Sequence, residues 1–227
     1  MFQRDYFMRM ISQMTEALGQ VLGLRKQMKQ EEALLVLDDL LDKHFRLSSK
    51  LIRSLSDEDL IKVMTTNGVA DTDHLQAIAV LMKQEGLLHG ELGRETECYG
   101  MYVRSLRLFV RLSLMGAEPT IVEPREQINE LLSLLSAYEL PDSAKRLLME
   151  WHEAEGRYDQ TENMMYELLE TSAMSPEEAS ETYRRLLEQS DEALTAGGLP
   201  REEIRQGMAD LQSAWKARGN EGVTNQA

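Results

Sequence analysis

The sequence predicts an all-α protein built from antiparallel helical hairpins that stack into a solenoid. Apolar residues recur at spacings of three and four along nearly the whole chain, as amphipathic helices require, and no segment alternates convincingly as a strand would. The segment from His89 to Cys98 is also echoed by the segment from His152 to Thr161, 63 positions later. That separation is close to two periods of about 32 residues, which indicates one stacked helix pair in each period.

The first half of the chain is predicted to contain five helices, each marked by an apolar stripe and most by a polar or acidic start. Gly93 turns the fourth into the fifth, which gives the clearest hairpin in the sequence. The five run from about Phe2 to Met28, from Glu31 to Leu41, from the Ser56 cap to the Asn67-Gly68 break, from the Asp71 cap through Leu88, and from Glu95 to about Met115.

A boundary is predicted after residue 116, because Gly116 is followed by Pro119 and Pro124, which cannot continue a helix. We therefore expect N-terminal hairpins in residues 1–116, acidic hairpins continuing the solenoid in 117–218, and a flexible tail in 219–227. Further helices are predicted from Arg125 to Leu140, Pro141 to Glu155, Asp159 to Thr171, the Ser175 cap to Gly197, and Pro200 through Trp215.

The net charge of −14 is concentrated in the second half of the chain. Residues 1–115 carry 15 Lys and Arg against 16 Asp and Glu, whereas residues 116–227 carry 10 against 23. This balance argues against binding to nucleic acid or to an anionic membrane, and no apolar run is long enough to span a membrane or act as a signal peptide. We expect a cytoplasmic protein whose acidic face is either simply solvated or meets a basic partner.

The hairpins resemble the tetratricopeptide repeat (TPR) family. Its turn and second helix are matched by Leu92-Gly93-Arg94-Glu95 with Cys98, Tyr102 and Leu106, by Gly156-Arg157-Tyr158-Asp159 with Thr161, Met165 and Leu168, and, in degenerate form, by Ala33, Leu37 and Leu40. Gly86 falls at the family's small first-helix residue. The chain departs from the family where His89 and His152 replace the expected aromatic residue and where the closing proline is absent. The resemblance implies a right-handed solenoid whose first helices line a concave groove.

The family's groove positions map onto Lys83 and Leu87 in one hairpin and onto Arg146, Glu150 and Glu153 in the next. Lys83 and Arg146 could hold a peptide carboxylate by charge-assisted hydrogen bonds. The alternative is that both cations are solvated or paired with neighbouring acids.

The whole chain also resembles an uncharacterised family, a domain of unknown function from Gram-positive, spore-former-type bacteria. The segments Arg4–Ile11 and Ser54–Leu60 carry this second resemblance. It implies a bacterial protein but brings no function with it.

Motifs for chemistry are nearly missing from the sequence. It has no glycine-rich phosphate loop after a strand, no nucleophile elbow and no paired-cysteine metal site, so we expect no catalytic residue, cofactor or metal. Glu85 and His89, one helical turn apart, could share a metal if more inward-facing acids joined them. Cys98 is expected to be a small packing residue. The pairs Trp151/His152 and Tyr99/Tyr102 are expected in the core or in a seam between helices.

Three functional hypotheses follow. The leading one is a non-enzymatic helical-repeat protein that binds another protein or a peptide. The alternatives are a peptide- or ligand-responsive regulatory switch, and a helical-bundle metal protein or enzyme built around Glu85 and His89. The long first helix could also pair with its copy in a second chain as a homodimer.

Overall fold

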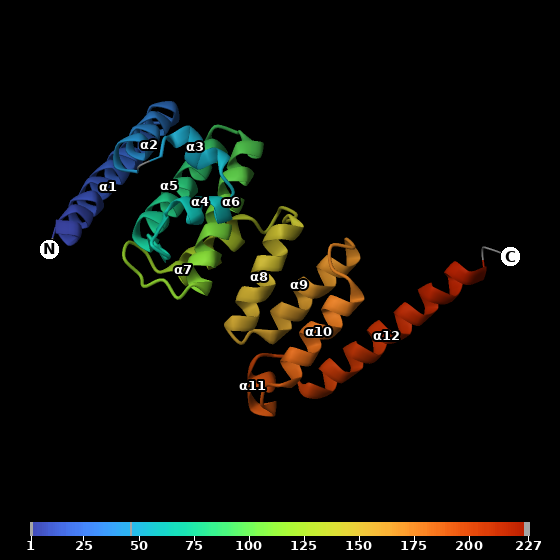
Figure 1. Cartoon of the computed structure of the whole chain (residues 1–227). Helices are drawn as coiled ribbons and strands as arrows, with labels where there is room; N and C mark the ends of the chain where they lie inside the picture. The colour runs from blue at the N-terminus through green and yellow to red at the C-terminus, as the bar shows by residue number, and fades with distance from the viewer. Residues whose placement is uncertain (1, 46, 225–227) are drawn as a thin grey trace. The chain divides into compact units, whose positions relative to one another are not determined.

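The computed structural model is helical almost throughout (Figure 1). It describes residues 2–45 and 47–224, and for residues 2–7, 10, 212 and 214–224 it describes the backbone alone. The chain divides into two compact units, Met1–Glu139 and Leu140–Ala227. The all-α class predicted from the apolar spacing is therefore confirmed.

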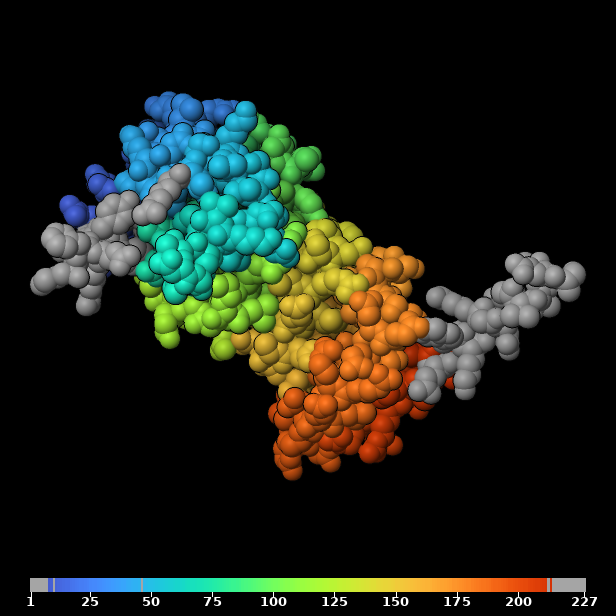
Figure 2. Space-filling model, in the orientation of Figure 1, coloured from blue at the N-terminus to red at the C-terminus, as the bar shows by residue number. Residues whose placement is uncertain are grey.

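The first unit holds two long helical hairpins joined by a segment of shorter elements. Its elements are α1 (Phe2–Lys26), α2 (Gln30–His44), α3 (Ser49–Ser54), α4 (Asp57–Val63), β1 (Thr65–Thr66), β2 (Val69–Ala70), α5 (Thr72–Glu91), α6 (Glu95–Leu114) and α7 (Pro124–Leu134). Helix α1 packs on α2, α5 packs on α6, and α2 contacts α5. Every residue from Leu75 to Lys83 is buried, so α5 is the core helix of this unit. The shorter elements α3, α4, β1 and β2, drawn in cyan, form much of the visible surface of the unit (Figure 2).

The second unit contains two helical hairpins. Its elements are α8 (Asp142–Ala154), α9 (Tyr158–Glu170), α10 (Pro176–Leu187), α11 (Asp191–Ala196) and α12 (Arg201–Thr224). Helix α8 packs on α9, α10 packs on α12 and on α9, and the short α11 lies in the connection between α10 and α12. In the part of the chain that is described, no helix combines the length and the apolar character needed to cross a membrane.

Three hairpin turns share one backbone geometry. In each, the second residue after the first helix is left-handed, with φ of 60° at Met28, 71° at Gly93 and 70° at Gly156. The next amide donates to the carbonyl five residues before it, which satisfies an orphan carbonyl of the helix end: Lys29 to Leu24 at 2.9 Å, Arg94 to His89 at 2.9 Å and Arg157 to His152 at 2.8 Å. Five residues after each left-handed position stands a buried small residue, namely Ala33, Cys98 or Thr161. The two sequence segments that repeat 63 residues apart therefore form turns of the same geometry.

Gly86 allows α5 and α6 to cross closely. A Cβ atom at this position would come within 2.6 Å of the ring of Tyr102, closer than real contacts allow. The small residue singled out in the sequence therefore lies at a helix crossing, as expected.

The expectation of no strand was wrong at residues 65–70. Asn67 and Gly68 both have positive φ, 53° and 78°, and they close a two-stranded antiparallel hairpin of β1 and β2. Asn-Gly is the preferred pair for a tight hairpin turn, because both of its central residues require positive φ. The same pair that was expected only to end a helix therefore also starts a second strand.

Two predicted helix ends were also wrong. The helix expected from Ser175 to Gly197 stops at Leu187, because Ser190 caps the separate helix α11 through its side chain. Arg201 stabilises this break by donating to the free carbonyls of Leu187 and Gln189, at 2.8 and 2.6 Å. The last helix continues to Thr224, beyond its expected end near Trp215 and into the predicted tail. Residues 225–227 of that tail lie outside the described residues.

The two units meet in sequence after Glu139, whereas the proline-rich boundary was expected after residue 116. The loop at that earlier position is bonded back onto the first unit. The buried side chain of Gln76 donates to the carbonyl of Glu118 at 2.7 Å and accepts from the amide of Thr120 at 3.2 Å. Helix α7 then packs on α6, so residues 117–139 belong with the first hairpins.

The shared turn predicts opposite effects of glycine and alanine at equivalent positions. Gly93→Ala should lower the free energy of unfolding by about 1 kcal/mol or more, because a Cβ is unfavourable in the left-handed region. Met28→Gly should raise it by roughly 0.5 kcal/mol, because Met28 carries that strain with a side chain that is 77% exposed. Urea titration would measure both changes. The matched control is Gln27→Gly, which should destabilise; equal destabilisation by Met28→Gly would contradict the shared turn.

Candidate functional site

Lys83 is not available to a peptide carboxylate. Its side chain is buried, and its Nζ donates to Oε1 of Gln127 at 2.8 Å and forms an ion pair with Glu130. Both partners lie on α7, so Lys83 ties α7 to the core helix α5. Leu87, one turn further along α5, is half-buried.

In the second unit, the candidate residues on α8 face α10. Arg146 forms an ion pair with Glu178 at 3.3 Å and also donates to the carbonyl of Ala173. Glu153 accepts two hydrogen bonds from Arg185, at 3.1 and 2.9 Å. Arg146 is thus paired with a neighbouring acid, as Lys83 is, which was the alternative to a carboxylate grip.

Glu150 lies between these two pairs along α8 and is exposed. The carboxylates of Glu153, Glu181 and Glu150 together raise the pKa of Arg185, mainly through its hydrogen bonds to Glu153. This places an exposed acidic cluster around one arginine on the surface shared by α8 and α10.

The residues considered for metal binding are used in a different way. His89 Nε2 lies 3.6 Å from Oε1 of Glu85, but Arg53 Nε also donates to both oxygens of that carboxylate, at 2.9 and 3.0 Å. Arg53 occupies the carboxylate that a metal would need. Among the described residues, no group of three or more His, Cys, Asp and Glu side chains is placed to hold a metal ion.

The other candidate residues lie in the packing of each unit. Cys98 is buried, and a Cβ added to Gly90 would lie 3.2 Å from its Sγ. Trp151 is 1% exposed, while Tyr99 is half-buried, packs on Tyr138 and donates to the carbonyl of Glu139 at 2.9 Å. The expected core or seam placement is confirmed for these residues.

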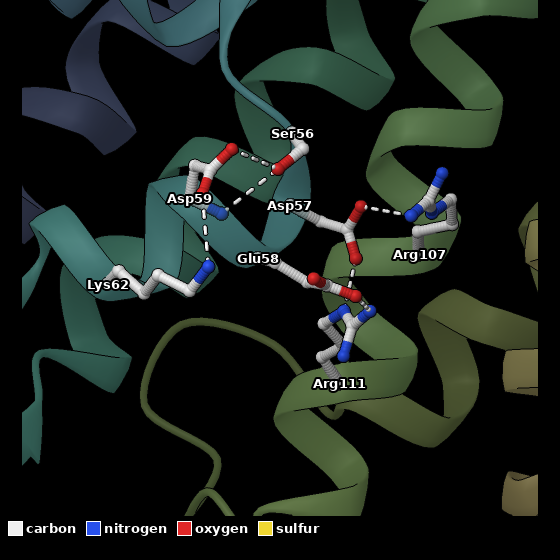
Figure 3. Close-up of polar contacts among 7 residues, drawn as sticks. All are labelled: Ser56, Asp57, Glu58, Asp59, Lys62, Arg107 and Arg111. Carbon is white, nitrogen blue, oxygen red and sulfur yellow. Dashed lines mark hydrogen bonds and ion pairs between the residues drawn. The ribbon is translucent and has the colours of Figure 1, made fainter.

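The structure brings together a charged cluster that the sequence did not single out, at the start of α4 (Figure 3). Ser56 caps α4, because its Oγ accepts from the amide of Asp59 at 3.0 Å and donates to Oδ2 of Asp59 at 2.8 Å. This cap fixes the start of the helix, so the next residue, Asp57, is held against α6.

Asp57 is the buried centre of the cluster. Its side chain is only 5% exposed, and it pairs with Arg107 at 2.5 Å and with Arg111. Arg111 also pairs with the exposed Glu58 at 2.5 Å. Two guanidinium groups on successive turns of α6 therefore bind one carboxylate. A buried carboxylate is destabilising unless a positive charge compensates it, and here the two arginines do so.

Beside Asp57 lies a cavity of about 80 Å³. Its walls are Leu55, Ser56, Asp57, Leu60, Met82, Val103, Arg104, Arg107 and Leu108. Arg104 donates to the carbonyl of Ile52 at 3.3 Å and to the carbonyl of Leu55. Both carbonyls lie at the C-terminal end of α3. Burial, and to a lesser degree the charge of Arg107, lowers the pKa of Arg104, while Asp57 raises it.

The sequence did carry a signal for this cluster. Arg104, Arg107 and Arg111 recur at spacings of three and four and so share one face of α6. What the sequence does not show is that the acidic start of α4, far away in the chain, covers that face.

His152, at the end of α8, is buried against Trp151, whose ring centroid lies 5.1 Å from the imidazole and 3.9 Å from the Arg157 guanidinium. Burial, with the positive charge of Arg157, lowers the pKa of His152 from 6.5 to about 4. The ring is therefore neutral at pH 7 and serves as a packing group at the second shared turn.

This pKa predicts a loss of stability in acid. The unfolded chain protonates His152 below about pH 6.5, whereas the folded chain resists until about pH 4. The unfolded state binds more protons within this window, so the free energy of unfolding should fall by about 3 kcal/mol as the pH drops through it. In urea titrations at pH 7, 6, 5 and 4, His152→Leu should fall less steeply than wild type. Equal slopes would contradict the low pKa.

Comparisons with known proteins give one match. No curated protein and no solved structure matches the chain. Among protein families, residues 1–216 match one that is described as a family of unknown function (DUF6483). This match covers nearly the whole chain and confirms the predicted membership of an uncharacterised family. The chain therefore belongs to DUF6483, a family of unknown function.

Proposed function

We propose that this protein is a non-enzymatic helical-repeat protein that binds another protein or a peptide, and that its hairpins form a TPR-like right-handed solenoid. The proposal rests above all on the ion pairs between α8 and α10. Arg146 pairs with Glu178, and Glu153 pairs with Arg185, and in both cases the partners are 32 residues apart. That interval is the repeat period inferred from the sequence. Neighbouring first helices of a solenoid place equivalent positions side by side, which is the arrangement that these pairs require.

The recognition surface in this proposal is the α8/α10 face, defined by Arg146, Glu150, Glu153, Glu178, Glu181 and Arg185. The internal ion pairs hold its two helices together, while Glu150 and Glu181 are exposed. Four acids against two arginines leave this face negative, and residues 140–227 carry 9 Lys and Arg against 18 Asp and Glu. We therefore expect a partner with a basic segment, attracted by complementary charge.

The same charge supports two narrower expectations. A surface of this sign disfavours nucleic acid and anionic membranes, so the partner is expected to be a cytoplasmic protein or peptide. Pairing of α1 with a second copy of the chain is a separate expectation, which does not involve the α8/α10 face.

The test is affinity capture from native lysate, with mass spectrometry to identify what is recovered. The variant Glu150→Lys/Glu181→Lys reverses the exposed charge of the α8/α10 face but leaves Arg146–Glu178 and Glu153–Arg185 in place. The matched control is Glu170→Lys/Glu192→Lys, which makes the same charge change at two exposed residues outside that face. Circular dichroism of all three proteins would check that they are folded.

We expect wild type and control to recover the same protein. The α8/α10 variant should lose it, because its reversed charge repels a basic partner segment, and added salt should weaken the wild-type interaction. Equal recovery by all three would show that the α8/α10 face does not recognise the partner. Recovery of nothing by wild type, at low and at physiological salt, would contradict the binding function itself.

A further inference from the structure

The cavity beside α4 and α6 has a surplus of positive charge. The charged groups that line it are Asp57, Arg104 and Arg107, which sum to +1. Of the other charges nearby, Arg111 is balanced by Glu58, and Glu85, whose charge also acts on Arg104, is bonded through both carboxylate oxygens to Arg53. Because Asp57 is already bonded to Arg107 and Arg111, its single charge cannot also neutralise Arg104.

Arg104 is incompletely satisfied within this wall. Its Nη2 donates to two backbone carbonyls, but its Nε is buried and donates to none of the described residues. A buried donor without an acceptor costs about 1–3 kcal/mol, so the protein leaves part of this guanidinium group uncompensated. Because Nε itself is closed off, an anion in the cavity would bind the accessible part of the group. Guanidinium groups prefer the oxygens of carboxylates and phosphates as such acceptors.

The cavity is large enough for more than one water. A single buried water needs roughly 10–15 Å³ on this measure, against the 80 Å³ found here. The side chain of Arg107 is 23% exposed, so the charged wall reaches solvent and a ligand can enter. Four other lining residues, Leu60, Met82, Val103 and Leu108, are apolar and would limit competing water.

We propose that this cavity binds a small oxyanion, such as phosphate or a carboxylate, through Arg104 and Arg107. The anion would neutralise the excess charge and join the α3 and α4 side of the cavity to α6. This site lies within the first unit, and it is independent of the protein-binding function proposed for the α8/α10 face.

The experiment is a titration of the full chain with inorganic phosphate, and separately with acetate, at constant ionic strength adjusted with chloride. Amide ¹H–¹⁵N shifts would report binding along α6. We expect at least one of the two anions to shift the amides of residues 103–108 in a saturable way. If neither does, the cavity holds only water and the proposal is overturned.

Two variants test the site, and one matched control tests its specificity. Arg104→Gln removes the charge and should weaken binding by about tenfold or more, as expected for loss of a charged hydrogen bond. Val103→Met keeps every charge but fills the cavity, and it should also abolish saturation. Lys62→Gln removes an exposed cation of α4 that pairs with Asp59 and does not line the cavity, and it should change the affinity by less than about twofold.

Circular dichroism would confirm that each variant is folded. If Arg104→Gln does not fold, the comparison of Val103→Met with Lys62→Gln decides the matter without it. Equal weakening by Lys62→Gln and Val103→Met, or none by Val103→Met, would show diffuse electrostatic attraction and would contradict a site in the cavity.

Discussion

The left-handed residue in the turn of three of the four hairpins is the constraint on which most of the fold depends. It reverses the chain at Met28, Gly93 and Gly156 with nearly the same φ, and it fixes how the second helix starts. Five residues later a small buried side chain lets that helix return along the first. The second helix therefore leaves the turn in the same way in these three hairpins.

Charged side chains in this protein act mainly as ties between helices. Three ion pairs join residues that are 32 positions apart in the sequence: Arg53–Glu85, Arg146–Glu178 and Glu153–Arg185. Two further ion pairs join helices over other intervals. Lys83 on α5 pairs with Glu130 on α7, and Asp57 on α4 pairs with Arg107 on α6. The two more exposed pairs, Arg146–Glu178 and Glu153–Arg185, contribute little stability individually, and their larger effect is to fix which residues face each other. Lys83 and Arg146, which looked suited to holding a peptide, are therefore paired inside their own units. In the proposed function, exposed neighbours such as Glu150 would take over recognition.

The sequence predicted the longer helices and the turns at Gly93 and Gly156, because these depend on local periodicity and on glycine. The sequence-based prediction failed where contacts with residues far away in the chain determine the local structure. The loop at Gly116 has every local mark of a domain boundary, yet Gln76, 42 residues before Glu118, bonds it to the core. The same holds for the candidate cavity: the arginine stripe on α6 is visible in the sequence, but the acidic cover supplied by Asp57 is not. Ser190 and Asn67-Gly68 are different, because a helix N-cap serine and a tight-turn pair are both recognisable in the local sequence.

The register of α8 against α10 supports both the repeat architecture and the α8/α10 face, and a double-mutant cycle on Glu153 and Arg185 would measure it directly. The four proteins are wild type, Glu153→Arg, Arg185→Glu and the charge-swapped double variant, compared by the free energy of unfolding. If the two helices face each other one period apart, each single reversal destabilises and the double variant recovers, with a coupling of about 0.5–1 kcal/mol. If the two single effects simply add, these residues are not in contact, and the stacked arrangement of α8 and α10 is wrong.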